Sequence, residues 1–79
     1  MARYYFKLYD SSGPTPDVEG CDLASNAAAH RHAVAAARAI MAEDVREGHL
    51  CLSDYIEVSN DSGEVVLNLP FSSAVKIDQ

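Results

Sequence analysis

Five side chains of this 79-residue chain are of the types that most often bind metals or act as nucleophiles: His30, His32, His49, Cys21 and Cys51. On a helix, His30 and His32 would point about 200° apart, so they cannot chelate one ion as an i, i+4 pair would. His49 and the two cysteines would form a ligand cluster only if the fold brought separate segments together. We expect instead that Cys51 fills space between two leucines and that His49 interacts with the end of a helix. The sequence therefore predicts no metal site and no cofactor.

The carboxylates and hydroxyls also lack the spacing that catalysis requires. The acidic stretch 17–22 does not match the D-x-[DN]-x-[DN]-G loop of calcium sites, and we interpret it as a solvated turn. Glu43 and Asp44 are neighbours on a predicted helix, so their side chains diverge and are poorly placed as an acid and base pair. No serine lies in a G-x-S-x-G sequence, and the four glycines form no phosphate-binding loop. We predict that the protein is not an enzyme.

The N-terminal segment carries the pattern with the most functional content. Tyr4, Phe6 and Leu8 alternate with polar and aromatic residues, which predicts a strand over Arg3–Tyr9 with two different faces. Residues of neighbouring strands would extend the outward face. The predicted interaction surface consists of Arg3, Tyr5, Lys7, Tyr9, Tyr55 and Val66.

Three interpretations of this surface are open. Tyrosines on an uncovered sheet face anchor protein interfaces well, which favours self-association or a protein partner. Alternatively, the tyrosines are only half-solvated, and Arg3 or Lys7 pairs across the strands with Glu57. Alternating arginine and tyrosine is also typical of sheets that stack single-stranded bases, so a nucleic-acid-binding regulator is the alternative function.

Net charge separates these interpretations. Twelve acidic and six basic residues give a net charge of −6, which opposes the electrostatic attraction that dominates nucleic-acid affinity. Nucleic acid is therefore an improbable partner. The main hypothesis is a non-catalytic interaction module that forms a homo-oligomer or binds another protein.

Apolar runs and cysteines indicate the compartment. The longest apolar runs, 33–37 and 39–42, are far shorter than the roughly 20 residues that cross a bilayer. The first ten residues are interrupted by Arg3, Lys7 and Asp10, unlike a secretory signal. The two cysteines are expected to be free thiols. We predict a cytoplasmic protein that does not bind a membrane.

A long helix is the clearest structural prediction. Nine of the sixteen residues from 27 to 42 are alanine, and no glycine or proline occurs between Cys21 and Glu47, which predicts about 20 helical residues. Ser25 is the expected N-cap, and Gly48 the residue that follows the C-cap. The predicted buried stripe is Ala29, Ala33, Ala36, Ala37, Ile40, Met41 and Val45, and the predicted solvated side carries Arg31, Arg38, Glu43 and Glu47.

Strands are predicted on both sides of this helix. After a turn at 10–14, residues 15–19 are expected to form a short edge strand. Residues 55–60 and 65–71 flank a glycine-bearing loop and predict a hairpin. In this hairpin Ile56, Val58, Val65, Leu67, Leu69 and Phe71 would face one way, and Tyr55, Glu57, Val66 and Asn68 the other. Pro70 should end the ladder, and Val75 and Ile77 should tuck under the helix.

The order hairpin, helix, hairpin predicts an α+β fold. We expect a small antiparallel sheet of three to four strands with one long helix packed on one face, in a single domain spanning residues 1–79. The predicted core is Tyr4, Phe6, Leu8, Ile40, Ile56, Val58, Leu67, Leu69 and Phe71, packed against a smooth alanine surface.

Several segments together resemble a family of short bacterial proteins known only as a domain of unknown function. They are RYYFKLYD near the start, DVEGCDL before the helix, AAARAIMAEDVREGHL across the helix end, and IEV followed by GEVVLNLPFSSAV in the closing hairpin. Members typically show a first strand ending in Asp, here Asp10, an Asp-x-Glu-Gly segment and a strand ending in Leu-Pro-Phe. Ala35 and Ala39 stand where the family usually has charged residues. The resemblance runs from Arg3 to about Ile77 and implies a fold and a cytosolic bacterial setting, but no catalytic residue.

Overall fold

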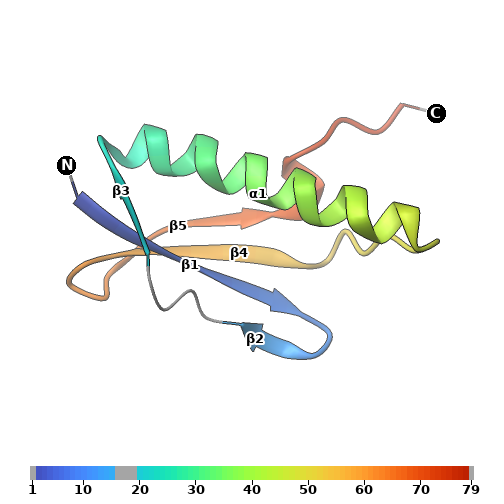
Figure 1. The fold of residues 1–79 in the computed structure, drawn as a ribbon, viewed down its shortest axis with the longest axis horizontal. Helices are drawn as coiled ribbons and strands as arrows, with labels where there is room; N and C mark the ends of the chain where they lie inside the picture. Colours follow the sequence, from blue (N-terminus) through green and yellow to red (C-terminus); the bar gives the residue numbers. More distant parts are fainter. Residues whose placement is uncertain (1, 16–19, 79) are drawn as a thin grey trace.

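The computed structural model describes residues 2–15 and 20–78 of the chain. They form an α+β fold with an antiparallel sheet, as predicted (Figure 1). The elements are β1 (Ala2–Asp10), β2 (Gly13–Thr15), β3 (Cys21–Leu23), α1 (Asn26–Arg46), β4 (Tyr55–Asn60), β5 (Val65–Pro70) and a 3-10 turn, η1 (Phe71–Ser73). The sheet has five strands, so the predicted three to four was too low.

The extra strand arises because two short strands pair with different ends of β1. The sheet order is β2-β1-β4-β5, and β3 also pairs with β1. Residues 8–10 of β1 pair with β2, and residues 2–4 pair with β3. Along its other edge, β1 pairs with β4 from Tyr4 to Tyr9. The long first strand is therefore the centre of the sheet and positions most of the predicted interaction surface.

The turn after β1 explains why β2 begins earlier than expected. The Asp10 side chain accepts a hydrogen bond from the backbone N–H of Ser12 at 2.9 Å, and Gly13 has a φ of 102°. These features close a tight hairpin in which Asp10 pairs with Gly13. The predicted edge strand over 15–19 therefore coincides with β2 only at Thr15, and its other residues lie outside the described part of the chain.

Both ends of α1 are capped as predicted. The Ser25 hydroxyl accepts the N–H of Ala28 at 3.2 Å. At the other end, Gly48 has a φ of 94°, its N–H donates to Val45 O at 3.0 Å, and the N–H of His49 donates to Asp44 O at 2.9 Å. This is a Schellman motif, which fixes the point where the chain leaves the helix.

One face of the sheet, called here the inner face, shares a buried cluster with α1. Its residues are Tyr4, Phe6, Leu8, Ile56, Val58, Leu67 and Leu69. The cluster also contains Phe71, and from the helix Ala29, Ala33, Ala37 and Met41, the three alanines being fully buried. Tyr4 donates a hydrogen bond to Asn26 Oδ1 at 2.7 Å, and the Phe6 ring lies 4.6 Å from that of His32. These contacts tie the start of α1 to β1.

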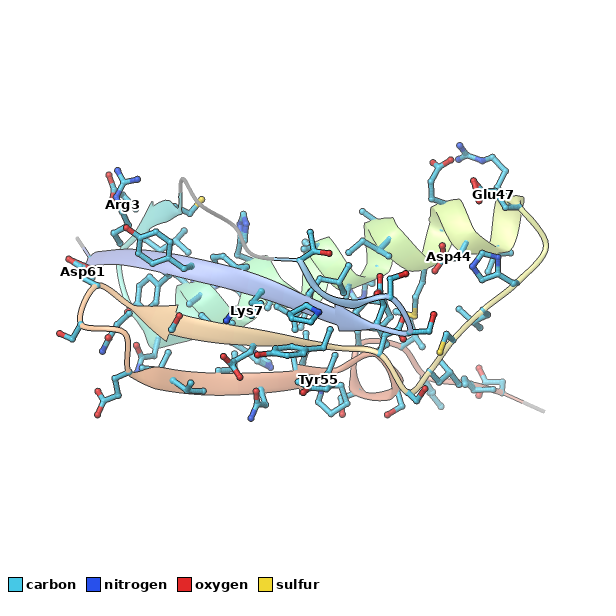
Figure 2. The ribbon with its side chains drawn as sticks, turned by 90° about the horizontal axis from the view of Figure 1, so that it is seen from below. Arg3, Lys7, Asp44, Glu47, Tyr55 and Asp61 are labelled. Atoms are coloured by element: carbon cyan, nitrogen blue, oxygen red, sulfur yellow. The ribbon has the colours of Figure 1, made fainter. Side chains whose placement is uncertain are left out.

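Three residues near the C-terminal half of α1 lie in environments that differ from the predicted ones. Val45 is 59% exposed, because this end of the helix extends beyond the ends of the strands (Figures 1 and 2). Ile77 is 53% exposed, whereas Val75 packs against the core. Arg38 was predicted to lie on the solvated side, but its Nε donates a hydrogen bond to Ala74 O at 2.7 Å.

A β-bulge overturns the predicted alternation of side chains in β5. Val58 pairs with Leu67 but Ser59 pairs with Val65, which leaves Val66 as the extra residue. Val65 is therefore 46% exposed rather than buried. Val66 is half-buried and packs against the core, although it was predicted to face away from it.

Among the described residues, no helix is both long enough and apolar enough to span a lipid bilayer, because α1 is too polar.

Candidate functional site

The candidate site lies on the sheet face opposite the inner face, called here the open face. Figure 2 views this side, with α1 behind the strands. Cross-strand pairs place Tyr9 beside Tyr55 and Lys7 beside Glu57. The open face consists of Arg3, Tyr5, Lys7, Tyr9, Tyr55, Glu57, Ser59, Val65, Asn68 and Pro70. Five of the six predicted surface residues are thus brought onto one face, and Val66 is replaced there by Val65.

The centre of the open face is a stacked pair of tyrosines. The Tyr9 and Tyr55 rings are 4.7 Å apart between centroids and 9° from parallel. The Lys7 Nζ lies 5.9 Å from the centroid of the Tyr9 ring, within the range of a cation–π contact. Tyr55 is 36% exposed, and Tyr9 is half-buried. The pair therefore presents a continuous, partly exposed aromatic surface.

At the other end of β1, Arg3 and Tyr5 are held by the segment that leads into β3. Arg3 Nε lies 3.3 Å from Asp22 Oδ1. A Cβ placed on Gly20 would lie 2.9 Å from the Tyr5 ring and 2.9 Å from Tyr4 O. Gly20 therefore packs directly against the backbone and ring of the first strand. Of the two predicted cross-strand partners of Glu57, Lys7 lies directly opposite it in the sheet, whereas Arg3 forms an ion pair with Asp22.

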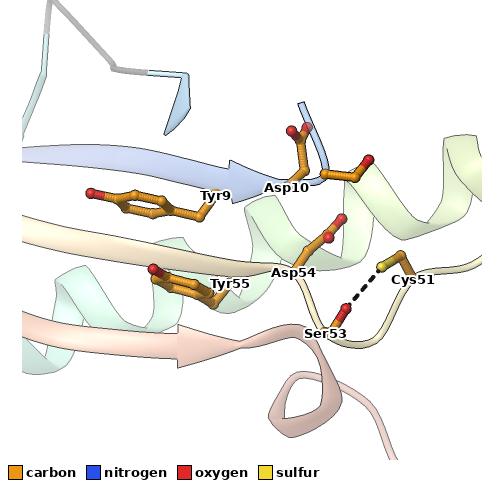
Figure 3. Close-up of a pocket in the computed structure, with 7 residues that line it drawn as sticks. Tyr9, Asp10, Cys51, Ser53, Asp54 and Tyr55 are labelled. Atoms are coloured by element: carbon orange, nitrogen blue, oxygen red, sulfur yellow. Dashed lines mark hydrogen bonds between the residues drawn. The ribbon is translucent and has the colours of Figure 1, made fainter. Parts of the chain in front are cut away.

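A pocket of about 330 Å³ opens where the tyrosine pair meets the ends of β1 and β4 (Figure 3). It is lined by Tyr9, Asp10, Ser11, Cys51, Ser53, Asp54 and Tyr55. Asp54 is only 8% exposed. Figure 3 shows its carboxylate pointing to the side of the pocket where Asp10 lies. The pocket is therefore an acidic hollow beside the aromatic centre of the open face.

Few features of the sequence indicate this pocket. Asp10 was interpreted only as a turn residue and Cys51 as a small filler. Cys51 instead lies at the pocket, with its Sγ 3.2 Å from Ser53 Oγ. Asp54 stands alone between a serine and a tyrosine, with no spacing that marks a site. Only the β1–β4 pairing brings these segments together.

The histidines and cysteines are dispersed. His32 contacts Phe6, and His49 Nε2 lies 3.4 Å from Asp44 Oδ1 at the end of α1, the position predicted for it. Cys21 and Cys51 are both free thiols. In residues 2–15 and 20–78, no three His, Cys, Asp or Glu side chains are grouped in a way that would hold a metal ion.

Comparisons with known proteins identify the family. No curated protein and no solved structure matches the chain. A family model matches residues 3–72, which include β1 from Arg3 onward, the other described strands and the whole of α1. The chain therefore belongs to DUF6894, a family defined by a domain of unknown function.

Proposed function

We propose that this protein is a non-catalytic interaction module that binds another protein chain, a second copy or a different protein, through its open face. The observation that carries the proposal is the stacked Tyr9–Tyr55 pair. Large aromatic side chains held in one rotamer lose little conformational entropy on binding, and tyrosine is enriched at the centres of interfaces.

The charges around the tyrosines also favour a protein partner. Lys7 and Glu57 lie directly across from each other on β1 and β4, so the face presents both signs of charge within a short distance. A mixed surface of this kind can complement another mixed surface, including its own copy related by a two-fold axis. The strand β5 adds a second feature, because it pairs only with β4 in the described part of the sheet and can accept a further strand.

Sedimentation equilibrium tests this proposal. We expect the protein to associate with itself, or with a captured partner, in a way that Tyr9→Ser and Tyr55→Ser weaken. Arg31→Ser is the matched control, since Arg31 is exposed on α1, away from the open face. A chain that stays monomeric at hundreds of micromolar, and that captures no protein in a manner dependent on the two tyrosines, would refute the proposal.

Nucleic-acid binding is the second candidate, favoured by the alternation of Arg3, Tyr5, Lys7 and Tyr9 along one face. Three observations weaken it. Arg3 already faces Asp22, the Tyr9 ring is already contacted by Tyr55 and Lys7, and the net charge is −6. A gel-shift assay with single-stranded oligonucleotides at low salt decides: binding that Arg3→Glu abolishes would establish this function, and no shift would eliminate it.

The proposed setting is the cytoplasm of a bacterium. The two free thiols are compatible with a reducing compartment. Immunoblotting of cytoplasmic, membrane and periplasmic fractions, with a compartment marker for each, tests this proposal.

A further inference from the structure

Asp54 is the one buried charged residue in the described part of the chain, with 8% of its surface exposed. Its backbone carbonyl accepts a hydrogen bond from the N–H of Phe71 at 2.9 Å. In residues 2–15 and 20–78, no hydrogen bond or ion pair is found for its carboxylate. Every fully buried side-chain oxygen or nitrogen in the same residues has a partner. The Asp54 oxygens are therefore still reachable by solvent, and the pocket that Asp54 lines is where they open.

The pocket lacks a positive charge. Its lining holds two carboxylates, Asp10 and Asp54, two serine hydroxyls and one thiol, but no lysine, arginine or histidine. The Asp10 carboxylate uses one oxygen to accept the N–H of Ser12. A carboxylate that is largely buried and has no protein partner has lost part of its hydration, so a cation that enters this pocket supplies an interaction that Asp54 lacks.

The walls of the pocket favour an organic cation over a metal ion. Calcium and magnesium need six or more oxygen ligands in a close shell, whereas the described residues hold no group of three acidic, histidine or cysteine side chains suited to a metal. Tyr9 and Tyr55 form part of the lining. Because the Tyr9 ring already contacts Tyr55 and Lys7, the interaction that an ammonium or guanidinium group would gain here is a charge-assisted hydrogen bond to the Asp54 carboxylate.

We propose that this pocket binds the cationic end of a lysine or arginine side chain of the protein that docks on the open face. The inference rests on the proposed function and names the chemistry of the partner. The tyrosine pair belongs both to the open face and to the pocket lining, so a partner on that face has the pocket within reach. The pocket volume of about 330 Å³ is at the small end of ligand sites, which suits the end of one side chain. The net charge of −6 would speed the approach of a basic partner.

A titration followed by two-dimensional ¹H–¹⁵N NMR tests the pocket without any partner. The probes are N-acetyl-arginine methylamide, N-acetyl-lysine methylamide and the neutral N-acetyl-norleucine methylamide. We expect shift changes confined to residues 9–11 and 51–55 with the two charged probes, saturating in the millimolar range. Asp54→Asn should weaken this binding about tenfold or more, and Asp61→Asn, an equal charge change at the exposed β4–β5 turn, should not.

Further variants and ligands complete the test. If Asp54→Asn does not give a folded spectrum, Asp10→Asn replaces it, because an asparagine oxygen can keep the bond to Ser12. No localised shifts, equal binding by the variant, or tighter binding of calcium or magnesium would overturn the proposal.

Agmatine, a free small cation, distinguishes a partner's side chain from a free small molecule as the source of the guanidinium group. If agmatine binds more than about tenfold tighter than the arginine probe, the ligand is a free amine and the assignment to a partner fails. Because these probes need no partner, failure of the open face as an interface would appear only in the sedimentation experiment.

Discussion

The inner and open faces of the sheet differ in what their side chains contact. On the inner face, Ile56 and Val58 are at most 2% exposed and lie in one cluster with the fully buried helix alanines. On the open face, two tyrosines of neighbouring strands stack on each other, and one of them is 36% exposed. The inner face thus contacts another layer of the protein, whereas the open face contacts mainly itself.

The difference separates the residues that stabilise the fold from those that we propose for recognition. Alanines allow a helix to approach a sheet closely but bury little area each, so the large inner residues supply most of the apolar burial. On the open face, the aromatic rings stack between neighbouring strands. Such a cross-strand pair stabilises the fold less than the burial of large side chains between two layers does. We therefore expect substitutions on the inner face to affect folding strongly and those on the open face to affect it weakly.

Phe71→Ala is expected to have the largest effect on folding. Phe71 is fully buried at the start of η1, and removing its ring leaves a cavity that costs about 3–5 kcal/mol of unfolding free energy. Urea denaturation followed by circular dichroism measures the loss. Ile77→Ala is the control, because Ile77 is 53% exposed. Equal losses for the two variants would contradict the layered core.

Gly20→Ala should be the next most damaging change, since Gly20 packs against the backbone of β1 and the Tyr5 ring. It has a φ of 72°, and a Cβ would lie 2.9 Å from Tyr4 O, a backbone atom that cannot easily move. We expect a loss of about 1–3 kcal/mol from backbone strain and this clash.

Gly63→Ala provides the comparison for Gly20. Gly63 has a similar φ of 80°, but a Cβ there would meet nothing within 4 Å. The difference between the two variants in thermal or urea unfolding isolates the clash with β1. If Gly63→Ala is as destabilising as Gly20→Ala, the close approach of Gly20 to the first strand contributes nothing.

Tyr55→Ser should separate stability from binding. The stacked pair is worth about 0.5–1.5 kcal/mol beyond the area it buries, so the variant should remain folded and unfold at a slightly lower urea concentration. Its association measured by sedimentation should fall far more than its stability. A variant that loses stability as strongly as Phe71→Ala would show that the open face belongs to the core.

Much of the inner face was predictable because it depends on local periodicity. Alternation identified β1, β4 and the inward Ile56 and Val58, and alanine content with Ser25 and Gly48 identified the helix and both caps. These signals are encoded by neighbours in the sequence. Val45 was misplaced because its burial depends on where the strands end, which a helical pattern does not contain.

The candidate site was less predictable because it depends on the pairing of distant segments. One extra residue in β5 exchanged the environments of Val65 and Val66, and no residue type in that strand marks the bulge. The pocket requires Asp10, at the end of β1, to lie near Asp54, which directly precedes β4 and is 44 positions later in the chain. Alternation predicted which side of β1 is exposed, but not the acidic hollow at its end.

The smallest expected effect is that of Asp22→Asn, which removes the ion pair with Arg3. The two side chains are 43% and 56% exposed, so water and salt screen their attraction, and such pairs contribute about 0–1 kcal/mol. We expect a loss within this range in low-salt urea denaturation, decreasing as sodium chloride is added. The same substitution removes one negative charge beside Arg3, so affinity for single-stranded oligonucleotides should rise if nucleic acid is a ligand. If stability is unchanged and no oligonucleotide binds, the Arg3–Asp22 pair serves neither folding nor nucleic-acid binding, and the proposed recognition would then depend on the stacked tyrosines at the other end of the open face.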